Sequence, residues 1–425
     1  MIRSIIQSLV GACLLCPLLV LAFEATVSGY GTIGYAKSDQ PFAYQRFVSD
    51  RGSFKRDSVV GLQFDAKLGD RFSLTVQGKA AASANSDAGV RADIAWAFLS
   101  YRPSNDWLIR VGRFRAPMYL HSETLDVGAT FDQVSLPVEV YSQSPTTDFN
   151  GISASKTWNL SSGELVLDGY WGSARTALRA WFREGFGADD PPGVVFLPIA
   201  VNVRGLALAL RGIEHTLRLG FADAVVDRRT TKVFITDFPF IDIPGLPGVG
   251  YYGVGDGIAP VRSQVRVRVL TMGVDIQAPN GWRMVGEYGR RSNKQSIGYD
   301  SQGAYAALLR RSGSWTPYVS YAFLRSSESN RRLYAAVNEN RVPDFIPGAA
   351  LINLSQRIGA DAIATYDQSA LAVGVSYALT PTSKLKAEVQ RVRIGEVSSL
   401  VDALTGTDVR RQNIRLLSLS YSVVF

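Results

Sequence analysis

Segments of about ten residues in which apolar and polar side chains alternate recur along the whole chain. In one of them Val60, Leu62 and Phe64 share one face, and Asp65 and Lys67 lie on the other. A period of two residues is that of a β-strand, because successive side chains of a strand point to opposite faces. Charges in the middle of the polar face do not suit the dry core of a soluble sandwich. They suit a wall that has lipid on one side and water on the other.

These alternating segments number about sixteen, and counts of fourteen or eighteen also fit the pattern. Each is close to the roughly 9–11 residues that a tilted strand needs to cross a bilayer. The segment 91–102 fits either parity of the alternation. The predicted strands are 26–36, 58–68, 71–81, 91–102, 106–114, 149–158, 164–172, 201–210, 213–225, 264–277, 282–291, 302–311, 315–325, 369–379, 384–394 and 413–425.

The connections between these segments alternate between short turns and long loops. Short turns at one end and long loops at the other are typical of outer-membrane barrels, and an even strand number returns both chain ends to the same side. We therefore predict an all-β fold, a transmembrane antiparallel β-barrel of about sixteen strands. The predicted long loops are 37–57, 82–90, 115–148, 173–200, 226–263, 292–301, 326–368 and 395–412.

The first residues are typical of an export signal. Arg3 precedes an apolar stretch, and Ala22 fits the rule that small residues stand before the cleavage site. We predict a signal peptide over 1–22, with cleavage after Ala25 as the alternative, and a single barrel domain over 23–425. Both cysteines lie within the signal peptide, so the mature protein would contain no disulfide bond.

The composition narrows the function classes. Charged residues make up 19% of the chain, below the quarter that is usual in soluble domains. The formal net charge is +8, but no run of Lys and Arg suggests a nucleic-acid-binding arm. With two Cys and two His, the chain offers no zinc-ligand set. We therefore expect no nucleic-acid partner, no metal and no cofactor.

The final segment carries the most specific signal. Its apolar residues share one parity and alternate with serines. A strand of this kind with an aromatic last residue resembles the strand that directs bacterial outer-membrane barrels to the barrel-assembly machinery. The residues of this predicted targeting strand are Leu417, Leu419, Tyr421, Val423 and Phe425.

Two further motifs stand at matching places: Ser28-Gly29-Tyr30-Gly31-Thr32 in the first strand, and Val111-Gly112-Arg113-Phe114-Arg115-Ala116-Pro117 at the end of the fifth. With the terminal Phe425 and the order of strands and loops, they make the chain resemble the sixteen-stranded porins of the bacterial outer membrane. The resemblance implies a homotrimer that is surrounded by outer-membrane lipid and lipopolysaccharide.

In porins the loop after the fifth strand folds into the lumen and narrows the pore. Residues 115–148 occupy that position, so the resemblance implies that they form a constriction loop. The acidic residues of this loop are Glu123, Asp126, Asp132 and Glu139.

Basic side chains are predicted to face the lumen. Guanidinium groups bind carboxylates and phosphates as planar forks, so a basic wall would attract anions. A general preference for Arg, or contact of Arg with lipopolysaccharide phosphates, is the other explanation. Under strict alternation Arg113 and Arg115 would face lipid, so we predict a bulge, or the start of the loop, near Gly112 that turns both inward. The predicted lumenal set is Lys79, Arg110, Arg113, Arg115, Arg218, Arg283, Arg291 and Lys386.

We predict an outer-membrane porin, a water-filled channel for passive diffusion of small hydrophilic solutes with a preference for anions. An alternative is a substrate-specific channel for an organic acid, a phosphate-like or an apolar solute, gated by residues 115–148 and 226–263. The apolar, aromatic loop 226–263 would plug the lumen, contact a neighbouring subunit, bind an apolar solute or pack on the barrel rim. A barrel enzyme or adhesin is the remaining alternative. His121 beside Ser122 does not establish a catalytic triad, and we predict no enzyme.

Overall fold

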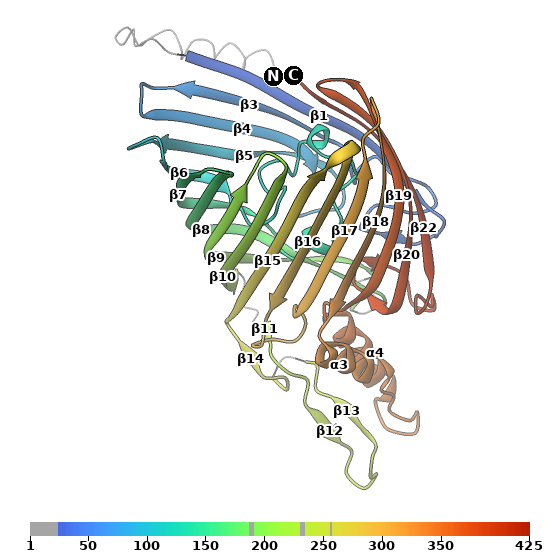
Figure 1. The fold of residues 1–425 in the computed structure, drawn as a ribbon. Coiled ribbons are helices and arrows are strands. Elements are labelled where there is room, and N and C mark those ends of the chain that lie inside the picture. The colour runs from blue at the N-terminus through green and yellow to red at the C-terminus, as the bar shows by residue number, and fades with distance from the viewer. Residues whose placement is uncertain (1–23, 187–190, 230–233, 256) are drawn as a thin grey trace, which may run out of the picture.

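The structure is a computed structural model that describes residues 24–425 apart from 187–190, 230–233 and 256. The predicted signal peptide, 1–22, lies outside the described residues. Within them the chain forms one closed antiparallel barrel of sixteen long strands (Figure 1). No helix among the described residues is long and apolar enough to span a membrane.

Sixteen strands at the predicted places confirm the fold class and the strand count. Each strand pairs with its neighbour along the chain, and β1 closes the ring against β22. The barrel strands are β1 (Glu24–Ser38), β3 (Val59–Lys67), β4 (Phe72–Ala82), β5 (Val90–Tyr101), β6 (Trp107–Arg115), β7 (Asp148–Leu160), β8 (Gly163–Phe182), β9 (Gly193–Arg211), β10 (His215–Arg228), β15 (Gln264–Ala278), β16 (Trp282–Ser292), β17 (Ser301–Arg310), β18 (Trp315–Ser326), β19 (Tyr366–Thr380), β20 (Ser383–Ser398) and β22 (Asn413–Val424).

The remaining elements are short and lie in the connections. They are β2 (Ala43–Tyr44), η1 (Gly128–Thr130), α2 (Val138–Tyr141), β11 (Phe234–Ile235), β12 (Phe240–Asp242), β13 (Gly250–Tyr252), β14 (Val261–Arg262), η2 (Pro279–Gly281), α3 (Glu328–Glu339), α4 (Ala349–Asp361) and β21 (Val401–Asp402). The C-terminus lies at one end of the barrel, and α3 and α4 lie at the other end, which we call the mouth (Figure 1).

The last strand shows how the alternation separates two environments. Leu417, Leu419 and Tyr421 are exposed on the outer surface, whereas Ser418 and Ser420 are buried on the inner side. Exposed large apolar side chains recur in this way on strands around the barrel. Such an outer belt is what a transmembrane barrel presents to lipid.

Strand β5 carries an irregularity that explains its ambiguous sequence. Gln77 of β4 lies opposite Trp96, but the next residue, Gly78, lies opposite Ile94. Ala95 is therefore an extra residue, as in a β-bulge. The alternation has one parity before Ala95 and the other after it, so each of the two parities that the sequence allowed holds in one half of the strand.

The connection 173–200 differs from its prediction as a long loop. Most of it is strand, because β8 and β9 continue beyond the wall and pair with each other until Phe182 lies opposite Gly193. We call this extension, Ala174–Phe182 with Gly193–Pro198, the mouth arm. Alternation of apolar and polar residues does not predict the mouth arm, because a hairpin that extends beyond the lipid needs no apolar outer face.

Residues 326–368, also predicted as a loop, contain the two helices α3 and α4. The Ser327 hydroxyl caps α3 by accepting a hydrogen bond from the Asn330 amide. Such side-chain acceptors satisfy backbone N–H groups that the first helical turn leaves free. Helix formation therefore has a local signal here that a search for strands does not detect.

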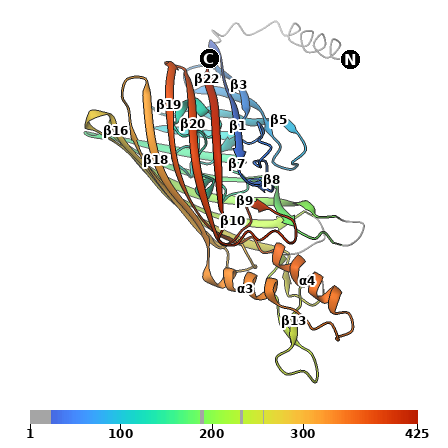
Figure 2. The same ribbon diagram turned by 90° about the vertical axis from the view of Figure 1, so that its right-hand side faces the viewer.

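The loop 226–263 packs against these helices at the mouth (Figure 2). The Gln356 side chain of α4 accepts from the Tyr252 amide at 2.9 Å and donates to the Tyr252 carbonyl at 2.8 Å. Val337 and Ala360 join Phe238 in an apolar cluster. Of the alternatives left open by the sequence, these contacts favour packing at the barrel rim.

Candidate pore and the loop inside it

The connection between β6 and β7 lies inside the barrel. We call residues 116–147 the inner loop; it contains η1 and α2. The loop follows the fifth barrel strand and bonds to side chains of β4, β10, β16 and β20. The prediction that residues 115–148 fold inward is therefore confirmed.

Asp126 holds one side of the inner loop to the wall. Its carboxylate accepts from Arg115 at 2.8 Å and from Lys79 at 2.8 Å, and Arg115 also bonds Asp148 at 2.6 Å. The Arg115 side chain is only 2% exposed. Burial alone would raise the pKa of Asp126, but the charges and hydrogen bonds of Arg115 and Lys79 lower it to about 2.

Asp132 makes a second ionic contact on another part of the wall. Lys384 donates to it at 2.8 Å, and Arg283 lies 3.4 Å away. Arg283 is shared with Asp275 of β15 at 2.6 Å. Burial opposes ionisation of Asp132, yet these cations hold its pKa below the usual value.

Two other predicted lumenal cations bind the backbone of the inner loop. Lys386 donates to the carbonyls of Gly128 at 2.6 Å and Gln133 at 2.9 Å. Arg218 donates to the carbonyl of Tyr119 at 3.1 Å. Carbonyl oxygens thus accept from both buried cations in place of a carboxylate, although the Arg218 Nε has no hydrogen-bond partner among the described residues.

Arg291 and Glu287 of β16 bind the loop from the same strand. Arg291 donates to the Gln143 carbonyl at 3.0 Å. Glu287 accepts from the Leu120 amide at 2.8 Å and from the Tyr141 hydroxyl. The sequence places Glu287 on the inward face but gives no sign of these partners, because they come from a distant loop.

The other two acidic residues of the loop differ from each other. Glu139 is fully buried and accepts from Gln368 at 2.9 Å, while its second oxygen has no hydrogen-bond partner among the described residues. Burial raises the pKa of Glu139. Glu123 is exposed. The sequence gives no reason to distinguish the four acidic residues of the loop, but they differ in burial, from the fully buried Glu139 to the exposed Glu123.

The wall residues Arg110 and Arg113 do not bind the loop in any contact we observe. The Arg110 guanidinium lies 5.4 Å from the centre of the Phe98 ring. Arg113 is half-buried and lies in register with Asn150. Pairing is regular on both sides of Gly112, so a bulge, the first form of the prediction, is absent, although Gly112 has a φ of 133°. The second form, the start of the loop, comes three residues later: β6 ends at Arg115, which bonds Asp126 of the inner loop. The extra residue sits on the neighbouring strand, and the lumenal direction of Arg113 remains a prediction.

A cavity of about 460 Å³ remains between the inner loop and the wall of β1, β3 and β4. Thr32, Arg56 and Ser58 line it from the wall side, and Ser135 and Ser142 from the loop side. The loop therefore narrows the lumen without filling it. The remaining space has a mixed lining, because apolar side chains such as Phe47, Leu125 and Phe131 lie beside these polar ones.

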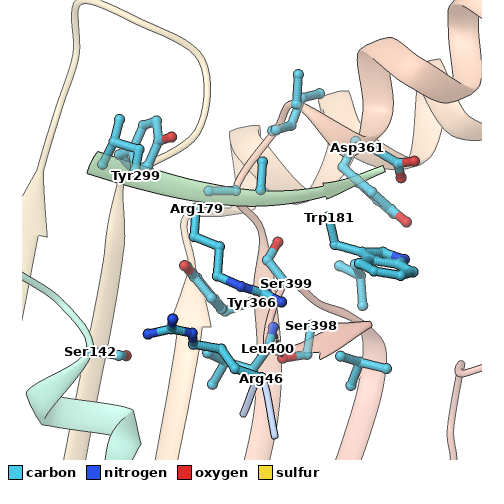
Figure 3. A pocket seen from close by; sticks show the side chains of 18 of the residues that line it. Arg46, Ser142, Arg179, Trp181, Tyr299, Asp361, Tyr366, Ser398, Ser399 and Leu400 are labelled. Carbon is cyan, nitrogen blue, oxygen red and sulfur yellow. Dashed lines mark hydrogen bonds between the residues drawn. The ribbon is translucent and has the colours of Figure 1, made fainter. Parts of the chain in front are cut away.

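A second cavity of about 330 Å³ lies nearer the mouth (Figure 3). Arg179 and Trp181 line it from the mouth arm, and Tyr366 lines it from β19. The Arg179 guanidinium bonds Asp402 at 2.5 Å and Asp87 at 2.7 Å. The arm is thus tied to the loops that follow β20 and β4.

His121 and Ser122 have structural contacts within the inner loop. The Ser122 hydroxyl accepts from the Tyr119 amide at 2.7 Å, and the His121 ring packs on Phe131 with 5.9 Å between ring centres. Burial, followed by the charge of Arg283, lowers the pKa of His121 to about 4, so the imidazole is neutral at pH 7. The described residues contain no group of His, Cys, Asp and Glu that could hold a metal ion.

Comparison with known proteins supports the fold. No protein-family model and no curated protein matches the sequence. Solved structures do match, among them the anion-selective porin from Comamonas acidovorans, at 11% identity over 95% of this chain and 100% of that chain, with a TM-score of 0.51. The outer-membrane expressed OmpT of Vibrio cholerae matches at 10% identity over 96% of this chain and 99% of that chain, with a TM-score of 0.50. The chain therefore has the sixteen-stranded barrel fold of the porins of the bacterial outer membrane.

Proposed function

We propose that this protein is a channel of the bacterial outer membrane through which small hydrophilic solutes diffuse passively. The observation that carries the proposal is the inner loop, which is fixed inside a closed barrel and leaves a cavity beside it that contains charged and hydroxyl side chains. A loop held on several sides sets a constant cross-section, and the polar members of the lining give hydrophilic solutes hydrogen-bonding partners.

The preference of this channel is for anions, and it is weak. Asp126 and Asp132 offset Lys79, Arg115 and Arg283. Backbone carbonyls, which carry no net charge, bind Arg218, Arg291 and Lys386 in the contacts described above. The wall thus keeps part of the positive charge predicted from the sequence, and that charge raises the local concentration of anions.

Single-channel recording in planar bilayers tests both statements. We expect steady conductance, and in a salt gradient a reversal potential of the sign given by anion permeation. Arg110→Gln removes a lumenal charge outside the loop contacts and should move the reversal potential toward zero. Arg332→Gln, on the exposed surface of α3, is the control and should not. A cation-selective reversal potential contradicts the anion preference, and absence of conductance contradicts the channel.

The same proposal includes assembly as a homotrimer and insertion guided by the C-terminal strand through the barrel-assembly machinery. The exposed apolar belt would be shared between lipid and sister subunits. A mass measurement in mild detergent should give three chains per particle. A monomeric mass would limit the proposal to a single-barrel channel.

A substrate-specific channel is the second candidate, and the cavity at the mouth favours it. Arginine, tryptophan and tyrosine side chains converge there next to the mouth arm, as they would around an organic anion. A specific channel gives solute flux that saturates at low concentration, whereas diffusion gives flux proportional to concentration. Liposome swelling with acetate, benzoate and neutral sugars distinguishes the two.

A further inference from the structure

The outer wall of β9 and β10 changes from apolar to charged at one level near the mouth. Leu206 and Phe221 are exposed and belong to the apolar belt. Two residues farther toward the mouth, the same outward positions hold Arg204 and Asp223, which lie opposite each other in register. The change marks the place where the belt ends and lipid headgroups begin.

Three arginines from two strands surround one carboxylate at this level. Asp223 contacts Arg204 at 3.1 Å, Arg266 at 2.6 Å and Arg268 at 3.7 Å. The arginine side chains are 71%, 43% and 58% exposed, whereas that of Asp223 is 9% exposed. One buried charge thus orients three exposed ones, and the group carries a formal surplus of two positive charges.

A groove of about 660 Å³ adjoins this arginine cluster on the outer surface. Apart from the cluster, Ser153 and Tyr170, its lining residues are apolar or glycine. Small residues, Ala154 of β7 and Gly169 of β8, make the hollow between larger side chains. Those larger residues are Ile152, Trp171, Leu206 and Phe221.

We propose that the cluster and the groove together form a binding site for a phosphate-bearing lipid of the outer leaflet. The headgroup phosphate is bound by Arg204, Arg266 and Arg268, and one acyl chain lies in the groove. Guanidinium forks match phosphate oxygens in pairs, and an apolar hollow next to them fits an amphiphile better than a free ion. A second copy of this face would bring the same surplus charge and be repelled.

The site goes beyond the channel function and is tested on the folded barrel in detergent. The probe is lipid A, which carries phosphate monoesters and acyl chains, and native mass spectrometry counts the bound molecules. The triple variant R204Q/R266Q/R268Q should weaken binding about fivefold for each arginine, since one basic side chain at an anionic surface contributes roughly 1 kcal/mol. The control R332Q/R410Q/R411Q removes three exposed, ion-paired arginines from the loops at the mouth and should bind as the wild type.

A second variant tests the groove without changing charge. Ala154→Leu with Gly169→Leu fills the hollow and keeps the wall apolar; a Cβ at Gly169 would meet its nearest atom, on Leu206, at 3.5 Å. A difference in gel mobility between unheated and heated samples, as for the wild type, shows that each variant has folded. We expect this variant to bind lipid A more weakly than the wild type does. The wild type should bind lipid A much more tightly than inorganic phosphate, which has no acyl chain to fill the groove. Binding of inorganic phosphate as tight as that of lipid A, or an unchanged affinity for lipid A in either variant, overturns the proposal.

Discussion

The inner loop lies inside the barrel and the mouth arm lies at its mouth; both are held by Arg–Asp pairs, but their surroundings differ. Arg115, which holds the inner loop, is 2% exposed. At the arm, the Arg179 side chain is 15% exposed, and its partners Asp87 and Asp402 are 22% and 5% exposed. Water therefore screens the Arg179–Asp87 pair of the arm more than it screens the pairs of the buried Arg115. Arg–Asp pairs therefore stabilise the position of the inner loop more strongly than that of the mouth arm.

The largest expected difference comes from breaking one pair in each region. Asp126→Asn leaves the buried Arg115 and Lys79 without part of their counter-charge, so we expect a loss of about 3 kcal/mol in the free energy of unfolding. Asp87→Asn, the matched change at the arm, should cost about 1 kcal/mol or less. Guanidinium unfolding followed by tryptophan fluorescence measures both. Equal losses would mean that burial does not separate the two regions.

A change of pH should have an intermediate effect on the free energy of unfolding. Its sign should be opposite for Asp361, next to the mouth arm, and for Asp126, in the inner loop. Burial raises the pKa of Asp361, which pairs with Arg183 next to the arm, to about 6. A raised folded-state pKa gives stability that is present below about pH 4 and lost as pH rises through 6. Asp126, whose pKa is lowered to about 2, contributes stability above about pH 4 and loses it only as pH falls through 2.

The measurement for this prediction is unfolding between pH 4 and 7 with Asp361→Asn as the comparison. The wild type should lose about 2 kcal/mol relative to the variant over this range. Asp126→Asn should show the wild-type pH dependence there, because Asp126 stays ionised. A variant difference that does not change between pH 4 and 7 would contradict the assignment to Asp361.

The smallest effect concerns a single hydrogen bond of the arm. The Trp181 indole donates to the Ala403 carbonyl at 2.9 Å. Trp181→Phe removes this donor and keeps most of the apolar contact, so the global stability should fall by about 1 kcal/mol or less. Limited proteolysis should nevertheless cut the arm faster than in the wild type. An unchanged cleavage rate would show that the ionic contacts of Arg179 and Arg183 hold the arm without the indole hydrogen bond.

The sequence predicts the strands of the barrel wall far better than it predicts the contacts of the inner loop or the elements at the mouth. Alternation is imposed by lipid on one side and water on the other, so every strand that meets both carries the pattern. The mouth arm and the helices α3 and α4 meet no lipid, and the pattern there is absent. The bulge at Ala95 inserts one residue, which alternation alone reports only as ambiguity.

The sequence indicates which wall residues face the inside of the barrel, but it does not indicate which atoms they contact there. Parity brings Lys79, Arg218, Arg283, Arg291 and Lys386 to the inside, where the structure also places them. Their partners are loop atoms far along the chain, and several are backbone carbonyls that no residue type reveals. The acidic residues of the loop likewise give no indication of which are buried.

The seam between β1 and β22 has a consequence for how the molecule is made. Thr32 and Ser422 are hydrogen-bonded across 390 positions of sequence, and Gly29 and Phe425 exchange two backbone bonds. Joining segments so far apart is the most entropically costly step of the fold. Until it is complete, two strand edges stay open to other chains. Closure is therefore the step at which a folding catalyst would shorten the vulnerable period most.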